Sequence, residues 1–245
     1  MRLSVVIPVY NQDDLAVRHV RACASATRPP EEVIVVDDGG AVGLEKKLAR
    51  GHWPFRLVYA RVLEDIPWNQ PGARNIGMVL STGDVISFED ADHLPGSGYY
   101  AAALDVLGGR QDVTLVRAER EYGGKTLAPS KSAWCVRRHA ILGIGGYDED
   151  FSGHYGHDDG LVIERLLRSG HAKKIGRHIS VPAHGGSRGY ERDASHNAAL
   201  LKLKLGKTRN LGGILRAPFC VSIIRSFSAG TSFAFAASRR SNMLD

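Results

Sequence analysis

Three carboxylates stand close together in the stretch SFEDADHLPG, which covers residues 87–96. Glu89, Asp90 and Asp92 follow a short apolar run that is typical of a buried strand. Like charges crowded at a strand end are costly unless a cation, a proton or a basic side chain offsets them. Mg²⁺ and Mn²⁺ prefer oxygen ligands and bind through one or two carboxylates together with substrate phosphates. Asp90 and Asp92 therefore predict a divalent metal site, with a solvated acidic turn as the alternative.

A second acidic pair, Asp37 and Asp38, follows the apolar run EVIVV. A carboxylate at a strand end can accept hydrogen bonds from the base or ribose of a nucleotide, or it can cap the helix that follows. Arg74 lies in GARN, near the start of a predicted helix. The helix dipole and the guanidinium both favour a phosphate there, and an ordinary surface arginine is the alternative.

The stretch GHYGHDDG, residues 153–160, contains a third acidic pair at the start of a predicted helix. The helix dipole favours carboxylates at this position, so capping is the alternative role for Asp158. A general base must instead face the cleft and reach an acceptor hydroxyl, and Asp159 is the candidate. His184, in VPAHGG, is a candidate metal ligand, although a lone histidine is more often structural.

Apolar runs alternate with longer amphipathic segments in the first half of the chain. Strands are expected at 3–9, 32–38, 55–60 and 84–90, and helices at 14–26, at 43–51 and from Pro71 to about Gly83. This alternation is typical of βαβ units and predicts an α/β fold with a mostly parallel central sheet flanked by helices. Ligands collect at the carboxyl ends of such strands. One crevice is therefore expected to be lined by Asp37, Asp38, Asp90 and Asp92.

The second half continues the pattern as far as about residue 200. Helices are expected at 99–109 and 161–170, strands at 112–119 and around 172–181, and a loop and hairpin over 121–138. Neither a linker nor a repeat interrupts this part. Residues 1–199 are therefore predicted to form one catalytic domain, followed by a basic, partly apolar appendage at 200–245.

Positive charge is concentrated in that appendage. The whole chain carries +6, whereas residues 200–245 hold eight Lys or Arg against one acid, so residues 1–199 carry about −1. No stretch approaches the roughly 20 apolar residues that span a bilayer. Arginines beside Phe and Ile suit the surface of an anionic membrane, and a C-terminal helix packed on the domain is an equal alternative. Nucleic acid is not expected as a partner, because no recognised binding motif accompanies the charge.

Three cysteines, Cys23, Cys135 and Cys220, form no C-x-x-C pair, so neither a disulfide framework nor a cysteine zinc site is indicated. A reducing compartment fits this usage. The N-terminal run breaks at Pro8 without a small-residue cleavage site, so it is interpreted as a first strand rather than a signal peptide. The expected location is cytoplasmic, at the inner face of the membrane if the basic appendage binds there.

Taken in order, several stretches resemble the family 2 glycosyltransferases, which use the GT-A nucleotide-sugar-binding fold. The resemblance covers roughly residues 3 to 175. It is carried by SVVIPVYNQ, EVIVVDDG, GARNIGMVLSTGDVISFEDAD and GGYDEDFSGHYGHDDGLVIERLLRSG. The last of these is also similar to the galactosyltransferase-type segment that ends in Gly-Trp-Glu-Asp, with His157 in the aromatic position and Asp158 replacing Glu.

This resemblance implies a binding site for a nucleotide-sugar, and a UDP-sugar is the expected donor. Asp37 or Asp38 would contact the base and ribose, and Arg74 would steady the nucleotide. The residues implied to border the nucleobase are Pro8, Val9 and Tyr10.

The resemblance also implies the catalytic groups. Asp90 and Asp92 match the family's D-x-D motif, with Asp92 as the direct ligand of Mn²⁺ or Mg²⁺. His184 matches a later histidine that completes the metal site in some relatives. Asp159 would be the base that removes the proton of a hydroxyl on a glycan or lipid-linked acceptor, and a single displacement would invert the anomeric centre.

Some positions depart from the family's pattern. Gly40 replaces the usual Ser after Asp-Asp-Gly, and His93 stands where another acid is frequent. These changes are expected to alter the choice of donor. Trp68 and Trp134 are candidates to stack on a sugar ring, but a buried core position is the preferred interpretation of each.

Two other classes of protein remain as alternatives. A metal-dependent phosphohydrolase also places D-x-D at a strand end, but it needs Thr or Val where this chain has Leu94, and its nucleophile follows the first strand. A non-catalytic nucleotide-sugar-binding or membrane scaffold protein would keep Asp38 and Arg74 but has no need for Asp159. A dehydrogenase is not indicated, because no G-x-G-x-x-G follows the first strand.

Overall fold

The computed structural model describes residues 1–129, 131–168, 170–181, 192–205, 215–225 and 233–235. The strands are β1 (Leu3–Val9), β2 (Glu32–Asp37), β3 (Arg56–Val62), β4 (Val85–Glu89), β5 (Leu94–Pro95), β6 (Val113–Tyr122), β7 (Lys125–Leu127), β8 (Ala133–Arg137), β9 (His171–Ser180), β10 (Phe219–Arg225) and β11 (Phe233–Phe235). The helices are α1 (Asp13–Ala24), α2 (Leu44–Ala49), α3 (Gln70–Leu80), α4 (Tyr99–Gly109), α5 (Arg138–Gly143), the 3₁₀ turn η1 (Glu149–Phe151), α6 (Asp158–Leu167) and α7 (Ser195–Lys204).

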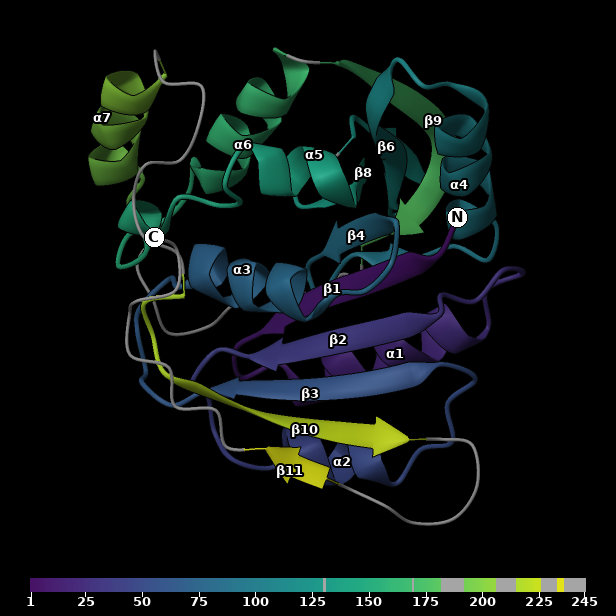
Figure 1. Ribbon diagram of the computed structural model, residues 1–245, viewed down its shortest axis with the longest axis vertical. Coiled ribbons are helices and arrows are strands. Elements are labelled where there is room, and N and C mark those ends of the chain that lie inside the picture. Colours follow the sequence, from purple (N-terminus) through teal and green to yellow (C-terminus); the bar gives the residue numbers. More distant parts are fainter. Residues whose placement is uncertain (130, 169, 182–191, 206–214, 226–232, 236–245) are drawn as a thin grey trace.

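Within these ranges the strands form one sheet in the order β11-β10-β3-β2-β1-β4-β8-β6-β9-β5, with β7 paired to β6. Figure 1 shows β11, β10, β3, β2 and β1 side by side in this order. Its centre, β3-β2-β1-β4, is parallel, as is the β6-β9 pair. The other pairs are antiparallel, including β4 with β8 and β3 with β10. The predicted α/β fold with helices around a central sheet is confirmed, but the sheet is mixed outside its parallel centre.

Period-two alternation divides the core into two layers. On β1, Val5 and Ile7 face a cluster that contains α1, α2 and α4, whereas Val6 faces a second cluster with α3, α5 and α6. Every residue of β1, β2 and β4 is buried, because helices cover both faces of the parallel centre. The continuous apolar runs in the sequence arise from this double coverage.

Helix α3 lies very close to β1, and a glycine makes that possible. A Cβ atom at Gly77 would lie 2.2 Å from Cγ1 of Val6, so only a residue without a side chain fits there. Pro71 stands in the first turn of α3, where its missing N–H costs nothing. This close packing fixes the start of α3, with Gln70 and Arg74, beside the carboxyl end of β4.

Most predicted elements are confirmed within one to three residues at each end. In the segment 121–138, β7 forms the expected hairpin with β6, and β8 then runs between β4 and β6. The predicted domain division at residue 200 stays a prediction, and residue 200 itself lies within α7. Residues 219–225 join the central sheet through β10. Among the described residues, every helix is too short or too polar to span a bilayer.

Candidate functional site

The parallel strands β1, β2 and β4 end at the same edge of the sheet, and a cavity of about 400 Å³ opens there. The end of β1 and the turn after β4 both contribute residues to its lining. The residues that line it are Pro8, Val9, Tyr10, Gln12, Asp38, Trp68, Gln70, Asp90, Ala91, Asp92, His93, Arg120, Ser132, Tyr155, Val181 and Arg192. The three residues predicted to border a nucleobase are therefore cavity residues, as are Asp38, Asp90 and Asp92.

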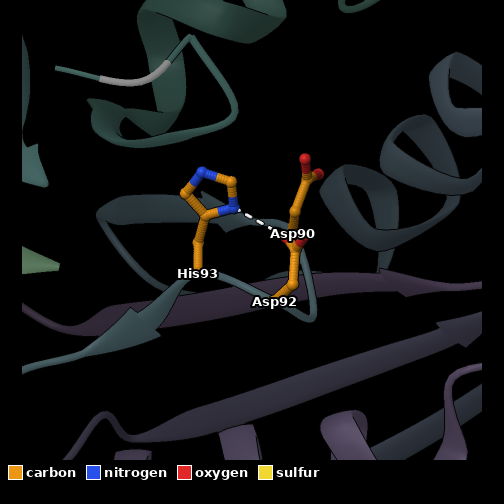
Figure 2. Close-up of side chains that lie close together, drawn as sticks. All are labelled: Asp90, Asp92 and His93. Carbon is orange, nitrogen blue, oxygen red and sulfur yellow. Dashed lines mark hydrogen bonds and ion pairs between the residues drawn. The ribbon is translucent and has the colours of Figure 1, made fainter. Parts of the chain in front are cut away.

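The carboxylates at the end of β4 point to opposite faces of the sheet, because successive side chains along a strand alternate. Glu89 points into the buried layer formed with α1 and α4, whereas Asp90 points to the opposite face, toward α3. Figure 2 shows the side chains of Asp90, Asp92 and His93 gathered on this turn, with the His93 ring hydrogen bonded to Asp92. One potential ligand atom from each of the three lies within 4.8 Å of the others. Glu89 is therefore not part of the cluster, and His93 is.

The composition of this cluster fits a divalent cation. Two carboxylates supply oxygen ligands, and the imidazole of His93 adds a nitrogen. Nδ1 of His93 lies 2.7 Å from Oδ1 of Asp92, while its buried Nε2 has no hydrogen-bond partner among the described residues. The hydrogen bond to Asp92 raises the pKa of His93 against the lowering effect of its burial. His184, the third ligand expected from the sequence, lies outside the described residues.

Asp37 and Asp38 have different surroundings although they are neighbours. Asp37 accepts hydrogen bonds from Tyr59, at 2.6 Å, and from Arg61, and it is not among the described residues that line the cavity. Asp38 does line the cavity, and its Oδ1 accepts a hydrogen bond of 2.7 Å from Asn69. Burial, with a smaller contribution from Asp37, raises the pKa of Asp38 to about 7. Of these two acids, both expected to line the crevice, Asp38 lines the cavity and Asp37 does not.

Arg74 is fully buried and connects three carboxylates. Its guanidinium nitrogens lie 2.7 Å from Asp90, 2.6 Å from Asp159 and 3.3 Å from Asp158, and the group stands 5.1 Å from the centre of the Tyr147 ring. Burial lowers the pKa of Arg74, but the negative charges around it raise that pKa well above its ordinary value. The alternative of a surface arginine is therefore wrong. Arg74 is not among the described residues that line either cavity.

A second cavity of about 330 Å³ adjoins the first and contains the acidic pair at the start of α6. It is lined by Trp68, Gln70, Pro71, Asp90, Lys131, Ser132, Phe151, His154, Tyr155, Gly156, His157, Asp158, Asp159, Gly160 and Ala194. Oδ1 of Asp159 accepts hydrogen bonds from Arg74, at 2.6 Å, and from the Tyr147 hydroxyl, at 3.0 Å. Burial raises the pKa of Asp159, although Arg74 opposes that shift, and the pKa of Asp158 is raised by burial and by the charge of Asp159.

Two aromatic side chains stand where the cavities meet. Trp68 and Tyr155 line both cavities, and their ring centroids lie 4.8 Å apart. Trp68 has a φ of 50°, an uncommon backbone conformation for a large side chain. The core interpretation is therefore correct for Trp134, which is fully buried, and wrong for Trp68.

Several site residues were not identified from the sequence. Gln70 donates a hydrogen bond to Asp90, Asn69 to Asp38 and Tyr147 to Asp159. The only sequence signal for Asn69 and Gln70 is their position directly before the predicted helix that contains Arg74. His93 was noted as a departure from the family's acid, but its place in the cluster follows from the geometry of the turn.

Comparison with known proteins agrees with this geometry. The family model described as "Glycosyl transferase family 2" matches residues 4–195. Validoxylamine A glucosyltransferase from Streptomyces hygroscopicus subsp. limoneus is 32% identical over 46% of this chain and 25% of its own length. Glycosyltransferase AglE from Haloferax volcanii is 32% identical over 49% of this chain and 40% of its own length. The chain thus covers less than half the length of either relative.

Solved structures are similar over more of the chain. S. aureus TarS 1-349, in complex with UDP-GlcNAc, has a TM-score of 0.71 at 13% identity and covers 83% of this chain and 65% of TarS 1-349. The mannosyltransferase PcManGT from Pyrobaculum calidifontis, in complex with GDP-Man and Mn²⁺, has a TM-score of 0.57 at 21% identity over 75% of this chain and 58% of its own. These likenesses confirm the predicted GT-A fold.

Proposed function

The chain belongs to glycosyl transferase family 2, and on that premise we propose that it transfers a sugar from a UDP-sugar to a hydroxyl of a glycan or lipid-linked acceptor. The transfer is metal-dependent and inverts the anomeric centre. The assignment to the glycosyltransferases rests on the family match and on the relatives. The donor, the metal, the stereochemistry and the acceptor are the parts that we propose here.

One observation supports the proposal above all others, namely that two cavities adjoin at the carboxyl ends of the strands. They share five lining residues, which are Trp68, Gln70, Asp90, Ser132 and Tyr155. Asp38 belongs to the first cavity alone and Asp159 to the second alone. A donor in the first cavity and an acceptor in the second would therefore meet beside Asp90.

On the donor side, the chain offers groups suited to each part of a nucleotide-sugar. The backbone and side chains of residues 8–10 form an apolar border for a flat base, and Asp38 accepts hydrogen bonds from base or ribose hydroxyls and N–H groups. Arg120 and Arg192 also line this cavity, and their charges favour a diphosphate. When bound by Asp90, Asp92 and His93, a divalent metal would stabilise negative charge on the departing diphosphate.

On the acceptor side, Asp159 is suited to act as the general base. Arg74 and Tyr147 both donate to its Oδ1, so Oδ2 is the oxygen that can take the proton of an acceptor hydroxyl. Burial raises the pKa of Asp159, which makes the carboxylate a stronger base, and the charge of Arg74 opposes that shift. Attack by that hydroxyl on the face opposite the diphosphate is a single displacement and gives inversion.

We further propose that the protein works in the cytoplasm, where residues 200–245 contact an anionic membrane surface at its inner face. The basic residues of this segment support that placement, apart from Lys204 and Arg216, which pair with Asp148 and Asp150. Nucleic acid is not a proposed partner.

The experiment that tests the donor site is calorimetric titration of UDP, GDP, dTDP and CMP, each with and without Mn²⁺. We expect UDP to bind with Mn²⁺ and the affinity to fall strongly in Asp92→Ala. The matched control is Asp105→Ala, which removes an exposed aspartate of α4 and should bind like the wild type. Preference for another nucleotide would refute the UDP assignment, and binding that ignores both Mn²⁺ and Asp92 would refute the metal site.

Catalysis is tested separately with Asp159→Asn. Hydrolysis of the UDP-sugar by water, measured as UDP release, should fall about 10²- to 10⁴-fold, the usual contribution of a general base. UDP binding without metal should be unchanged because Asp159 lines only the second cavity. Equal turnover in the variant and the wild type would exclude Asp159 as the base.

A further inference from the structure

Glu89 is a carboxylate that the metal cluster does not use, and the fold buries it completely. Its side chain has no exposed surface, and Nε2 of His19 lies 2.6 Å from its Oε2. The Tyr100 hydroxyl donates to the same oxygen at 3.2 Å, and Ser87 donates to Oε1. Glu89 is therefore surrounded by hydrogen-bond donors from α1, α4 and its own strand.

His19 is equally buried, although it lies on an apolar helix face. It belongs to the stripe of α1 that packs on the sheet, with Ala16, Val20 and Cys23. A buried ionisable pair in such a place gives little net stability, because the cost of removing both groups from water offsets their attraction. The presence of this pair directly before the cluster is therefore not explained by packing alone.

The second nitrogen of His19 connects the pair to the turn. Nδ1 lies 3.4 Å from the carbonyl oxygen of Ala91, the residue between Asp90 and Asp92. Two backbone hydrogen bonds also hold this turn, from the N–H of His93 to Asp90 at 2.9 Å and from the N–H of Asp90 to Ser132 at 3.0 Å. A carboxylate and a carbonyl oxygen are both acceptors, so His19 makes the two contacts with a proton on each ring nitrogen, and it then contacts the middle of the turn from the buried side.

We propose that the His19–Glu89 pair positions the Asp90–Asp92 turn for binding of the divalent cation. Glu89 holds the imidazole in one orientation, and the imidazole in turn holds the peptide between the two ligand residues. Cation sites require ligand atoms fixed to within about 0.5 Å, and loss of a supporting partner typically lowers metal affinity about 10- to 100-fold. This inference rests on the proposed metal-dependent nucleotide site.

The test compares Glu89→Gln and His19→Gln with Glu32→Gln. Glu32 is the matched control because it is also a buried strand carboxylate, which accepts hydrogen bonds from Ser4 and Arg56, but it lies at the opposite end of the sheet. The readouts are the affinity for Mn²⁺ in the presence of UDP, measured from the EPR signal of free Mn²⁺, the affinity for UDP without metal, and the thermal midpoint of unfolding.

We expect both site variants to lose about 10- to 100-fold in Mn²⁺ affinity, with metal-free UDP affinity unchanged. Glu32→Gln should lower the thermal midpoint and leave Mn²⁺ affinity within twofold of the wild type. If Glu89→Gln and His19→Gln fall in stability only, the pair is structural and the inference is wrong.

A milder variant covers the case in which neither substitution folds. Tyr100→Phe removes one donor to Glu89 and keeps the ring, and it should weaken Mn²⁺ binding measurably without changing metal-free UDP binding. Unchanged Mn²⁺ affinity in this variant would overturn the inference. Failure of the wild type to bind UDP and Mn²⁺ at all would instead refute the proposed function on which the inference rests.

Discussion

Substitution of Asp38 by Asn should make the protein more stable at neutral and alkaline pH. Asp38 is only 6% exposed, and its pKa is raised to about 7 by burial and by the nearby negative charge of Asp37. Asn cannot ionise, and its carbonyl oxygen can still accept the hydrogen bond that Asn69 now donates to Asp38. The variant therefore removes an unfavourable buried charge and keeps the contact.

The sign follows from proton linkage. An acid whose pKa is higher in the folded than in the unfolded state binds protons more tightly when folded, so stability is present at low pH and is lost as pH rises. For Asp38 the window runs from its ordinary value of 3.8 to about 7. At 1.36 kcal/mol for each pKa unit, that difference corresponds to about 4 kcal/mol in the free energy of unfolding.

Urea denaturation at pH 4 and at pH 8 measures this difference. Wild type and Asp38→Asn should agree within about 0.5 kcal/mol at pH 4, and the variant should be about 2–4 kcal/mol more stable at pH 8. Asp105→Asn, at an exposed position on α4, controls for the general effect of removing an acid. Parallel pH profiles for the wild type and Asp38→Asn would refute the reasoning, because the buried carboxyl would then titrate as it does in the unfolded chain.

Three other substitutions have expected outcomes. Arg74→Met should cost about 3–5 kcal/mol and more at pH 8 than at pH 5, because the acids left unpaired can take protons at the lower pH. Equal urea-denaturation losses at both values would contradict this. Gly77→Ala should lower thermal stability by about 1–3 kcal/mol despite its better helix propensity, since the new Cβ meets Val6 at 2.2 Å, and an unchanged melting temperature would argue against that contact. Asn197→Ala should cost about 1–3 kcal/mol and increase hydrogen exchange in residues 151–156, whose carbonyl groups lose its hydrogen bonds. Unchanged exchange would show that other contacts hold this loop.

The parallel centre of the fold was predictable because its signal is local. Strands β1, β2 and β4 are buried on both faces, so their sequences are continuous apolar runs, and the helices between them show clear periodicity. The placement of β8 between β4 and β6 was not predictable in the same way. Its short sequence, AWCVR, is compatible with several partners, and only long-range pairing decides among them.

Site residues were predictable where they follow directly from a strand end, as for Asp90 and Asp92. Sequence could not distinguish Asp37 from Asp38, because the difference arises from Tyr59 and Arg61 on the neighbouring strand. Nor could it place His19, whose position on a buried helix face looks like an ordinary core position. The partners of these residues lie 22 to 72 positions away in sequence, and no short motif encodes such contacts.

Arg74 pairs with a carboxylate in each of the two parts of the site. One guanidinium is shared by Asp90, in the proposed metal cluster, and by Asp159, the proposed base; Asp159 is buried and Asp90 is partly buried. A charge that offsets one acid changes the electrostatic environment of the other, because buried groups are screened little by water. Asp90 itself is a source of charge that raises the pKa of Asp159, while Arg74 lowers it. The basicity of the proposed catalytic carboxylate is therefore set in part by the charge state of the proposed metal-binding turn. The proposed donor site and the proposed base are in this way coupled through a single buried side chain on α3.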